Sequence, residues 1–166
     1  MSPPLLVRTH SFPKLNLRKW LLVRFKWNLM PDIHIVDRYF KAVNKLGVRN
    51  DGKGLDYFIP DVETVDISHF AVAFRSGYTA FVVGAKHNTK ALPEERIVDL
   101  IRSSERPVIL LGGPEDVEKG NRIVAAVGEE RVFNACGKFT LNQSASLVRQ
   151  AQKVITHDTG LMHIAA

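Results

Sequence analysis

The chain has 166 residues, of which 45% are hydrophobic and 24% are charged. That balance is typical of a folded globular protein and excludes wholesale disorder, while the length excludes a complete two-domain enzyme. The formal net charge of +6 is uneven, because residues 1 to 54 hold 11 Lys and Arg against 3 Asp and Glu, whereas residues 55 to 166 hold 12 against 14. Since the longer part is nearly neutral, we expect no nucleic acid as a partner of the whole protein.

The single cysteine, Cys136, excludes an internal disulfide. No group of Cys and His residues has the spacing of a zinc site, so the sequence predicts no metal and favours a reducing cytoplasm. Basic residues interrupt every apolar run near the N-terminus, namely Arg8, Lys14, Arg18, Lys19 and Arg24. We therefore expect neither an export signal nor a membrane span, which takes about 20 apolar residues.

The basic first part of the chain predicts two short helices. Residues 15 to 27 interleave apolar and basic side chains, and residues 33 to 46 carry apolar side chains at three- and four-residue spacing before Gly47, a typical helix-ending glycine. Residues 48 to 66 show little periodicity and predict a loop or linker. We therefore divide the chain into a basic helical segment with its linker, residues 1 to 66, and a domain formed by residues 67 to 166.

Strands and helices alternate in the second part. Strands are expected at residues 79–83, 107–111, 131–134 and 153–156, and helices at 93–103, 117–127 and 142–150, with a last helix opening at Gly160. Short all-apolar strands suit a sheet that is covered on both faces, so the pattern predicts an α/β fold with a Rossmann-like, doubly wound parallel sheet. Because Ala166 falls just inside the last helix, we expect an incomplete domain and a truncated chain.

Ligands of such sheets bind beyond the carboxyl ends of the strands, which directs attention to the loops there. The first loop runs from Gly84 to Lys90, where a small-residue turn and an ammonium group could hold phosphate, although solvated lysines are an equally simple interpretation. The second holds Gly112 and Gly113, which permit close approach of a ligand, followed by Glu115, which could accept ribose hydroxyls or merely complement a helix dipole.

The third loop follows the expected strand at residues 131–134, and the fourth follows the strand at 153–156. Each also allows a functional and a structural interpretation. Cys136 has no base near it in sequence, which favours a buried inert thiol over a nucleophile. In the fourth loop, Thr159 and Gly160 could offer a hydroxyl and N–H groups to phosphate, with Asp158 and His163 beside them. A simple helix cap explains the Asp-Thr-Gly sequence equally well.

Taken in order, the four loops resemble one family, glycosyltransferase family nine, which includes the ADP-heptose:lipopolysaccharide heptosyltransferases. Residues 84–93 are similar to its G-A-x-x-x-x-K-x-W-P stretch, with Lys90 at the lysine, and residues 110–115 to its L-L-G-G-P-E segment. Residues 134–138 lie where the family has N-L-x-G-K, and residues 158–166 resemble its hallmark D-T-G-P-M-H-L-A-A. The resemblance covers roughly residues 77 to 166. Leu92 and Leu161 replace a usual tryptophan and proline, and neither substitution removes a polar contact.

The resemblance implies a GT-B enzyme that needs no cofactor and transfers a sugar with inversion from a nucleotide donor, usually ADP-heptose, to a lipopolysaccharide-core acceptor. This chain would be the C-terminal, donor-binding half, preceded by two helices from the inter-domain region. Contact with the inner face of the inner membrane would be peripheral. Donor contacts would come from Lys90, Glu115, Asp158, Thr159, Gly160 and His163, with Gly84, Gly112 and Gly113 lining the loops.

The resemblance also indicates what this chain does not supply. The family's general base is an acidic residue near the start of an N-terminal acceptor domain, and nothing here resembles that region. We therefore assign no catalytic residue, interpret Asp32 and Asp37 as solvated or structural, and expect the chain to be inactive alone. Two other functions stay open: a basic module that binds nucleic acid or an anionic membrane surface around Trp20 and Trp27, and a GT-B enzyme that uses a UDP-sugar.

Overall fold

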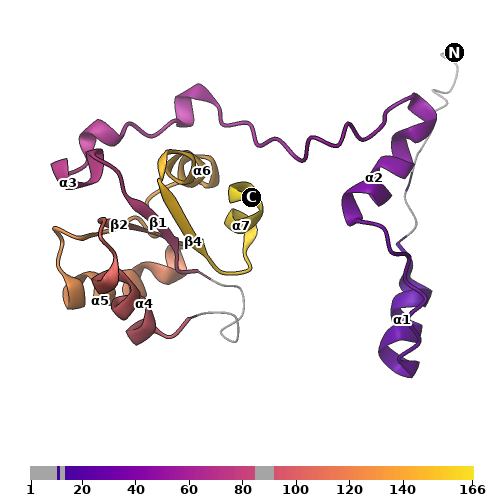
Figure 1. Ribbon diagram of the computed structural model, residues 1–166, viewed down its shortest axis with the longest axis horizontal. Helices are drawn as coiled ribbons and strands as arrows, with labels where there is room; N and C mark the ends of the chain where they lie inside the picture. The colour runs from indigo at the N-terminus through magenta and orange to yellow at the C-terminus, as the bar shows by residue number, and fades with distance from the viewer. Residues whose placement is uncertain (1–10, 12–13, 85–91) are drawn as a thin grey trace, which may run out of the picture. The chain divides into compact units, whose positions relative to one another are not determined.

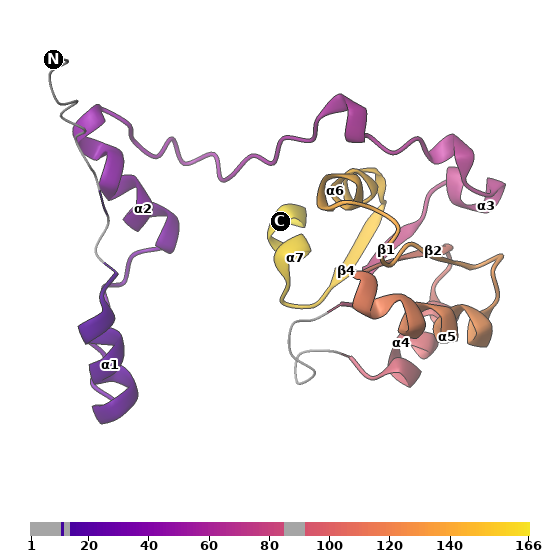
Figure 2. The same ribbon diagram turned by 180° about the vertical axis from the view of Figure 1, so that it is seen from behind.

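The computed structural model describes residue 11 and residues 14–84 and 92–166. The chain forms two compact units, Met1–Asp56 and Tyr57–Ala166, and each is described by itself. Figures 1 and 2 show the two units from opposite sides, with the sheet and its helices confined to the second.

The first unit consists of two short helices, as the sequence predicts. Helix α1 spans Asn16–Phe25 and buries no residue. Helix α2 spans Ile35–Val43, buries only Arg38 and is extended by the 3-10 turn η1, Asn44–Leu46, which ends at Gly47 with a φ of 80°. None of the described helices has the length and apolar character that crossing a membrane would require.

The second unit opens with short elements that the sequence did not reveal. They are the 3-10 turns η2 (Asp61–Glu63) and η3 (Ile67–His69) and helix α3 (Val72–Arg75). Residues of the predicted linker are hydrogen-bonded to helix α6, Leu141–Gln150. Ser146 Oγ accepts from the Val65 amide at 3.0 Å, and Gln150 Nε2 donates to the Val65 carbonyl at 3.0 Å. This part of the chain therefore lies on α6.

The core of the second unit is a parallel sheet of four short strands. They are β1 (Thr79–Val82), β2 (Val108–Leu111), β3 (Val132–Asn134) and β4 (Lys153–Thr156), in the spatial order β3-β2-β1-β4. Thr79 of β1 lies opposite Val108 of β2 on one side and Lys153 of β4 on the other. All three pairings are parallel, which confirms the predicted sheet.

Helices cover both faces of this sheet, so the predicted doubly wound α/β fold is also confirmed. Helices α4 (Glu94–Ser103) and α5 (Val117–Val127) lie on one face, and α6 and α7 (Gly160–Ala165) lie on the other (Figure 1). Alternate residues of a strand point to opposite faces. Accordingly, Ala80 and Val82 belong to the core cluster that includes α6, whereas Phe81 belongs to the cluster with α4 and α5. Burial of each large side chain in these clusters contributes about 1.5–3 kcal/mol.

Candidate functional site

The strand order places a crevice at the carboxyl ends of the strands. From β1 the chain moves to β2 and β3 on one side, and β4 then pairs with the other side of β1. Helix α4, which follows β1, and helix α7, which follows β4, lie on opposite faces of the sheet, and open α/β sheets bind ligands at such a switch point. A pocket of about 480 Å³ lies here. Its lining consists of the last residue of β1 and of residues that follow all four strands: Val82, Gly84, Gly112, Gly113, Glu115, Asp116, Phe139, Leu141, Ser144, Thr159, Gly160 and Leu161.

Most of the residues predicted for the site line this one pocket. Gly84, Gly112, Gly113, Glu115, Thr159 and Gly160 are all among them. Asp158 and His163 are exposed and do not line it, although both lie beside its Thr159–Gly160 wall. Lys90 lies outside the described residues. The fold thus brings residues of all four predicted loops together, since Phe139 of the third loop also lines the pocket, and the roles of the predicted site residues remain predictions.

Asp116, the residue after Glu115, also lines the pocket. Its Oδ2 accepts a hydrogen bond from the Gly113 amide at 2.9 Å. A Cβ atom added to Gly84 would lie 2.4 Å from the same oxygen, and one added to Gly112 would lie 2.6 Å from it. The carboxylate therefore fills the space that side chains at these two glycines would need.

Glu115 adds a second carboxylate at the β2 end of the pocket. A Cβ atom on Gly113 would lie 2.4 Å from Glu115 Oε2, so this side chain folds back over the glycine turn. Two carboxylates at one end repel phosphate and accept hydrogen bonds from hydroxyl groups. This end of the pocket therefore suits a neutral, hydroxyl-bearing part of a ligand.

The part of the lining that follows β3 is mainly apolar and is held in place by its neighbours. Phe139 stacks on Phe70 with ring centroids 6.4 Å apart and an interplanar angle of 17°. Next along the chain, Thr140 caps α6, because its hydroxyl accepts from the Gln143 amide at 3.2 Å while the Gln143 side chain accepts from the Thr140 amide at 3.0 Å. Leu141 begins the helix on this wall. A flat apolar group fits such a surface.

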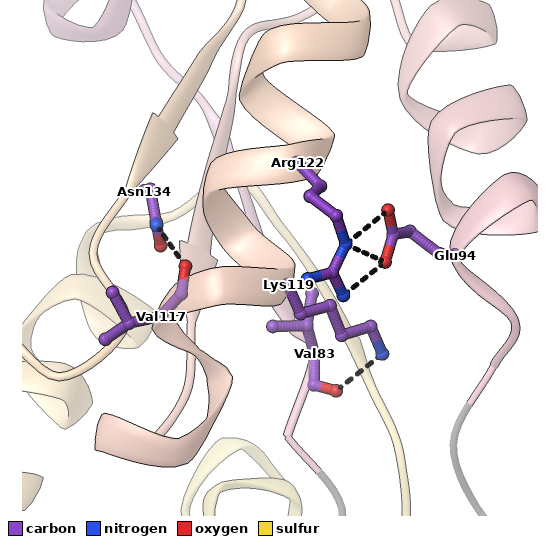
Figure 3. A network of polar contacts seen from close by, with 6 residues as sticks. All are labelled: Val83, Glu94, Val117, Lys119, Arg122 and Asn134. Atoms are coloured by element: carbon purple, nitrogen blue, oxygen red, sulfur yellow. Dashed lines mark hydrogen bonds and ion pairs between the residues drawn. The ribbon is translucent and has the colours of Figure 1, made fainter.

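Polar contacts fix the helix that follows the two carboxylates (Figure 3). Lys119 Nζ donates to the Val83 carbonyl at 3.3 Å, and Asn134 Nδ2 donates to the Val117 carbonyl at 3.1 Å. Arg122 pairs with Glu94 at 2.9 Å. These contacts tie the first two turns of α5 to Val83 after β1, to β3 and to α4, and they fix the helix that the Glu115–Asp116 turn begins.

Comparison with known proteins identifies the family. The sequence model of glycosyltransferase family 9 (heptosyltransferase) matches residues 13–166. The chain belongs to this family.

The relatives of this family 9 chain are longer than it is. It is 28% identical over 155 residues to lipopolysaccharide heptosyltransferase 2 of Salmonella typhimurium, covering 84% of this chain and 43% of that protein. The solved structure of Escherichia coli ADP-heptose lipopolysaccharide heptosyltransferase II matches with a TM-score of 0.65 at 24% identity, over 79% of this chain and 44% of that one. An E. coli heptosyltransferase solved with ADP matches with a TM-score of 0.57 at 22% identity, over 84% and 43%. The chain thus spans less than half the length of these relatives.

A histidine that the sequence did not single out joins two loops of this family 9 domain. His157, directly after β4, accepts a hydrogen bond at Nε2 from the Leu92 amide at 3.1 Å, and its ring packs edge-on against Phe81. His157 Nδ1 is buried without a hydrogen-bond partner among the residues that the structure describes. The contact fixes the end of the segment that follows β1 beside the segment that follows β4. No local sequence pattern indicates it, because its partner is 65 residues away.

Cys136 is a buried free thiol, in agreement with the interpretation from sequence. Its side chain is buried, and burial together with the nearby Asp116 carboxylate raises the pKa of the thiol to about 12. The nucleophilic thiolate is therefore scarce at neutral pH. Within residues 14–84 and 92–166, no group of three or more His, Cys, Asp or Glu side chains is arranged to hold a metal ion.

Proposed function

We propose that this chain carries the donor site of a heptosyltransferase and binds the nucleotide of ADP-heptose in the pocket at the carboxyl ends of its strands. One observation carries the proposal: glycine turns after β1 and β2 and the Thr159–Gly160 turn after β4 line a single pocket with Glu115. The family match and the ADP-heptose and ADP named for its structural relatives favour this donor over a UDP-sugar.

The charges of the pocket suggest how the nucleotide lies. Ribose hydroxyls would donate to Glu115 and Asp116, because phosphate would be repelled there. The base would lie on the apolar wall of Phe139 and Leu141. The diphosphate would then extend toward Thr159 and the sugar beyond it.

Four further donor contacts rest on the family resemblance. Lys90, Asp158, Gly160 and His163 would surround the diphosphate and heptose, with Lys90 supplying positive charge. In the proposed reaction, heptose passes with inversion to a hydroxyl of a lipopolysaccharide-core acceptor. Cationic and N–H groups would stabilise the departing ADP as its negative charge develops. None of the carboxylates in this chain is assigned as the general base.

A specific feature of the first unit favours a second, peripheral role at an anionic membrane surface. The rings of Trp20, Phe25 and Trp27 contact one another, with centroids 5.5 and 5.6 Å apart, and each side chain is at least half exposed. Residues 14 to 31 also carry five Lys and Arg and no Asp or Glu. Exposed aromatic and basic residues together suit the interface of an anionic bilayer. Binding of the chain to phosphatidylglycerol vesicles but not to phosphatidylcholine vesicles would support this role, and equal binding to both would contradict it.

Thermal-shift titration tests the donor assignment. ADP or ADP-heptose at about 100 times its Kd is expected to raise the melting temperature by about 5 °C or more, and UDP-sugars are expected to leave it unchanged. Glu115→Ala should weaken ADP binding about 10- to 100-fold, because a ribose hydroxyl loses a charged acceptor. Glu118→Ala removes the same charge from an exposed position of α5 outside the pocket and should bind normally. Stabilisation by UDP-sugars, or equal affinities of the two variants, would refute the assignment.

A further inference from the structure

Ser144 is a buried polar residue in the wall of the nucleotide pocket. Its exposed fraction is 8%, and it lines the pocket as the fourth residue of α6. Its hydroxyl makes no hydrogen bond to any residue that the structure describes. A serine within a helix commonly bonds to the carbonyl four residues earlier, but here the Thr140 carbonyl accepts only the Ser144 amide, at 2.9 Å.

Ser146, two residues further along the same helix, has a buried hydroxyl that is hydrogen-bonded within the protein, as buried hydroxyls usually are. It is fully buried, and its hydroxyl accepts from the Val65 amide and from Gln150 Nε2, each at 3.0 Å. Buried hydroxyls are costly unless they are paired, as this one is. The Ser144 hydroxyl has no such partner among the described residues, and it is not among their buried unpaired atoms, so it is open to the pocket that Ser144 lines. The hydroxyl is therefore available to a group bound in the pocket.

The surroundings of Ser144 indicate which part of the ligand it meets. Leu141 lies three residues earlier, so the two side chains share one face of α6, and both line the pocket together with Phe139. The carboxylates that suit ribose come instead from the turn before α5. A single hydroxyl in an otherwise apolar wall can orient a flat ring by its polar edge.

Given the donor site proposed above, on which this inference rests, we propose that Ser144 Oγ hydrogen-bonds to the edge of the nucleotide base and thereby contributes to the choice of nucleotide. The hydroxyl can both donate and accept, so it can pair with a ring nitrogen or an exocyclic amine of adenine. Removing it leaves the base its stacking surface but one polar contact fewer.

Isothermal titration of the full chain with ADP tests the inference through a pair of serine variants. Ser144→Ala should weaken ADP binding about three- to tenfold without lowering the melting temperature of the ligand-free protein. Ser146→Ala should do the reverse, with a lower melting temperature and unchanged ADP affinity. Ribose 5-diphosphate, which has the same diphosphate and ribose but no base, should bind Ser144→Ala and the wild type equally.

The outcomes separate this inference from the function on which it rests. If the wild type binds ADP and Ser144→Ala binds it equally well, the role of Ser144 is refuted and the donor site stands. If Ser144→Ala loses affinity for ribose 5-diphosphate by the same factor as for ADP, the hydroxyl contacts the ribose or phosphates and the assignment to the base is wrong. If the wild type binds neither compound, the donor site itself is refuted.

Discussion

Glycine at position 84 is required by a neighbouring carboxylate rather than by its own backbone. Its φ lies outside the left-handed region, and a Cβ atom there would lie 2.4 Å from Asp116 Oδ2. Gly84→Ala should therefore destabilise the second unit by about 1–3 kcal/mol through overpacking. Asp116→Ala should also destabilise it, because the Gly113 amide loses its acceptor. In the double variant the clash is gone, so its loss of stability should be smaller than the sum of the two single losses. Urea unfolding of all four proteins measures this coupling, and strictly additive losses would show that the two side chains do not compete for space.

At the scale of elements, the pattern of apolar side chains predicted those strands and helices that the local sequence determines. The all-apolar run at residues 108 to 111 is strand β2, and α5 has the predicted bounds. The glycine turns and Glu115 were predictable because strand-end loops of a parallel sheet converge. The elements η2, η3 and α3 were missed because each is three or four residues long and is held by contacts with distant parts of the chain. The sequence did not identify three further residues at the site, because tertiary packing places them there: Asp116, Ser144 and His157.

One such contact between elements can be tested directly. The Ser146 hydroxyl holds the Val65 amide against α6, so Ser146→Ala should destabilise the second unit by about 1–3 kcal/mol and speed hydrogen exchange at that amide. Ser103→Ala is the matched control, because the Ser103 hydroxyl bonds only to the Leu100 carbonyl within α4. Unchanged protection of the Val65 amide in Ser146→Ala would mean that the segment before β1 is held by its apolar contacts alone.

At the scale of the whole molecule, the two units differ sharply in how much apolar surface they bury. Both core clusters consist of residues from the second unit, whereas α1 buries nothing and leaves Leu17, Trp20 and Val23 more than half exposed. Exposed apolar surface of this kind promotes association. We therefore expect the full chain to self-associate, so that its apparent molecular mass in size-exclusion chromatography increases with protein concentration.

A piece comprising residues 57–166 should remain monomeric under the same conditions and keep the stabilisation by ADP, because the cores and the described walls of the pocket lie within it. Replacing Trp20, Phe25 and Trp27 with serine in the full chain provides the control, since it removes the exposed rings without shortening the protein. A full chain that stays monomeric at high concentration would contradict the predicted association. Loss of the ADP response in the shorter piece, with its fold intact by circular dichroism, would show that the first unit contributes to the nucleotide site.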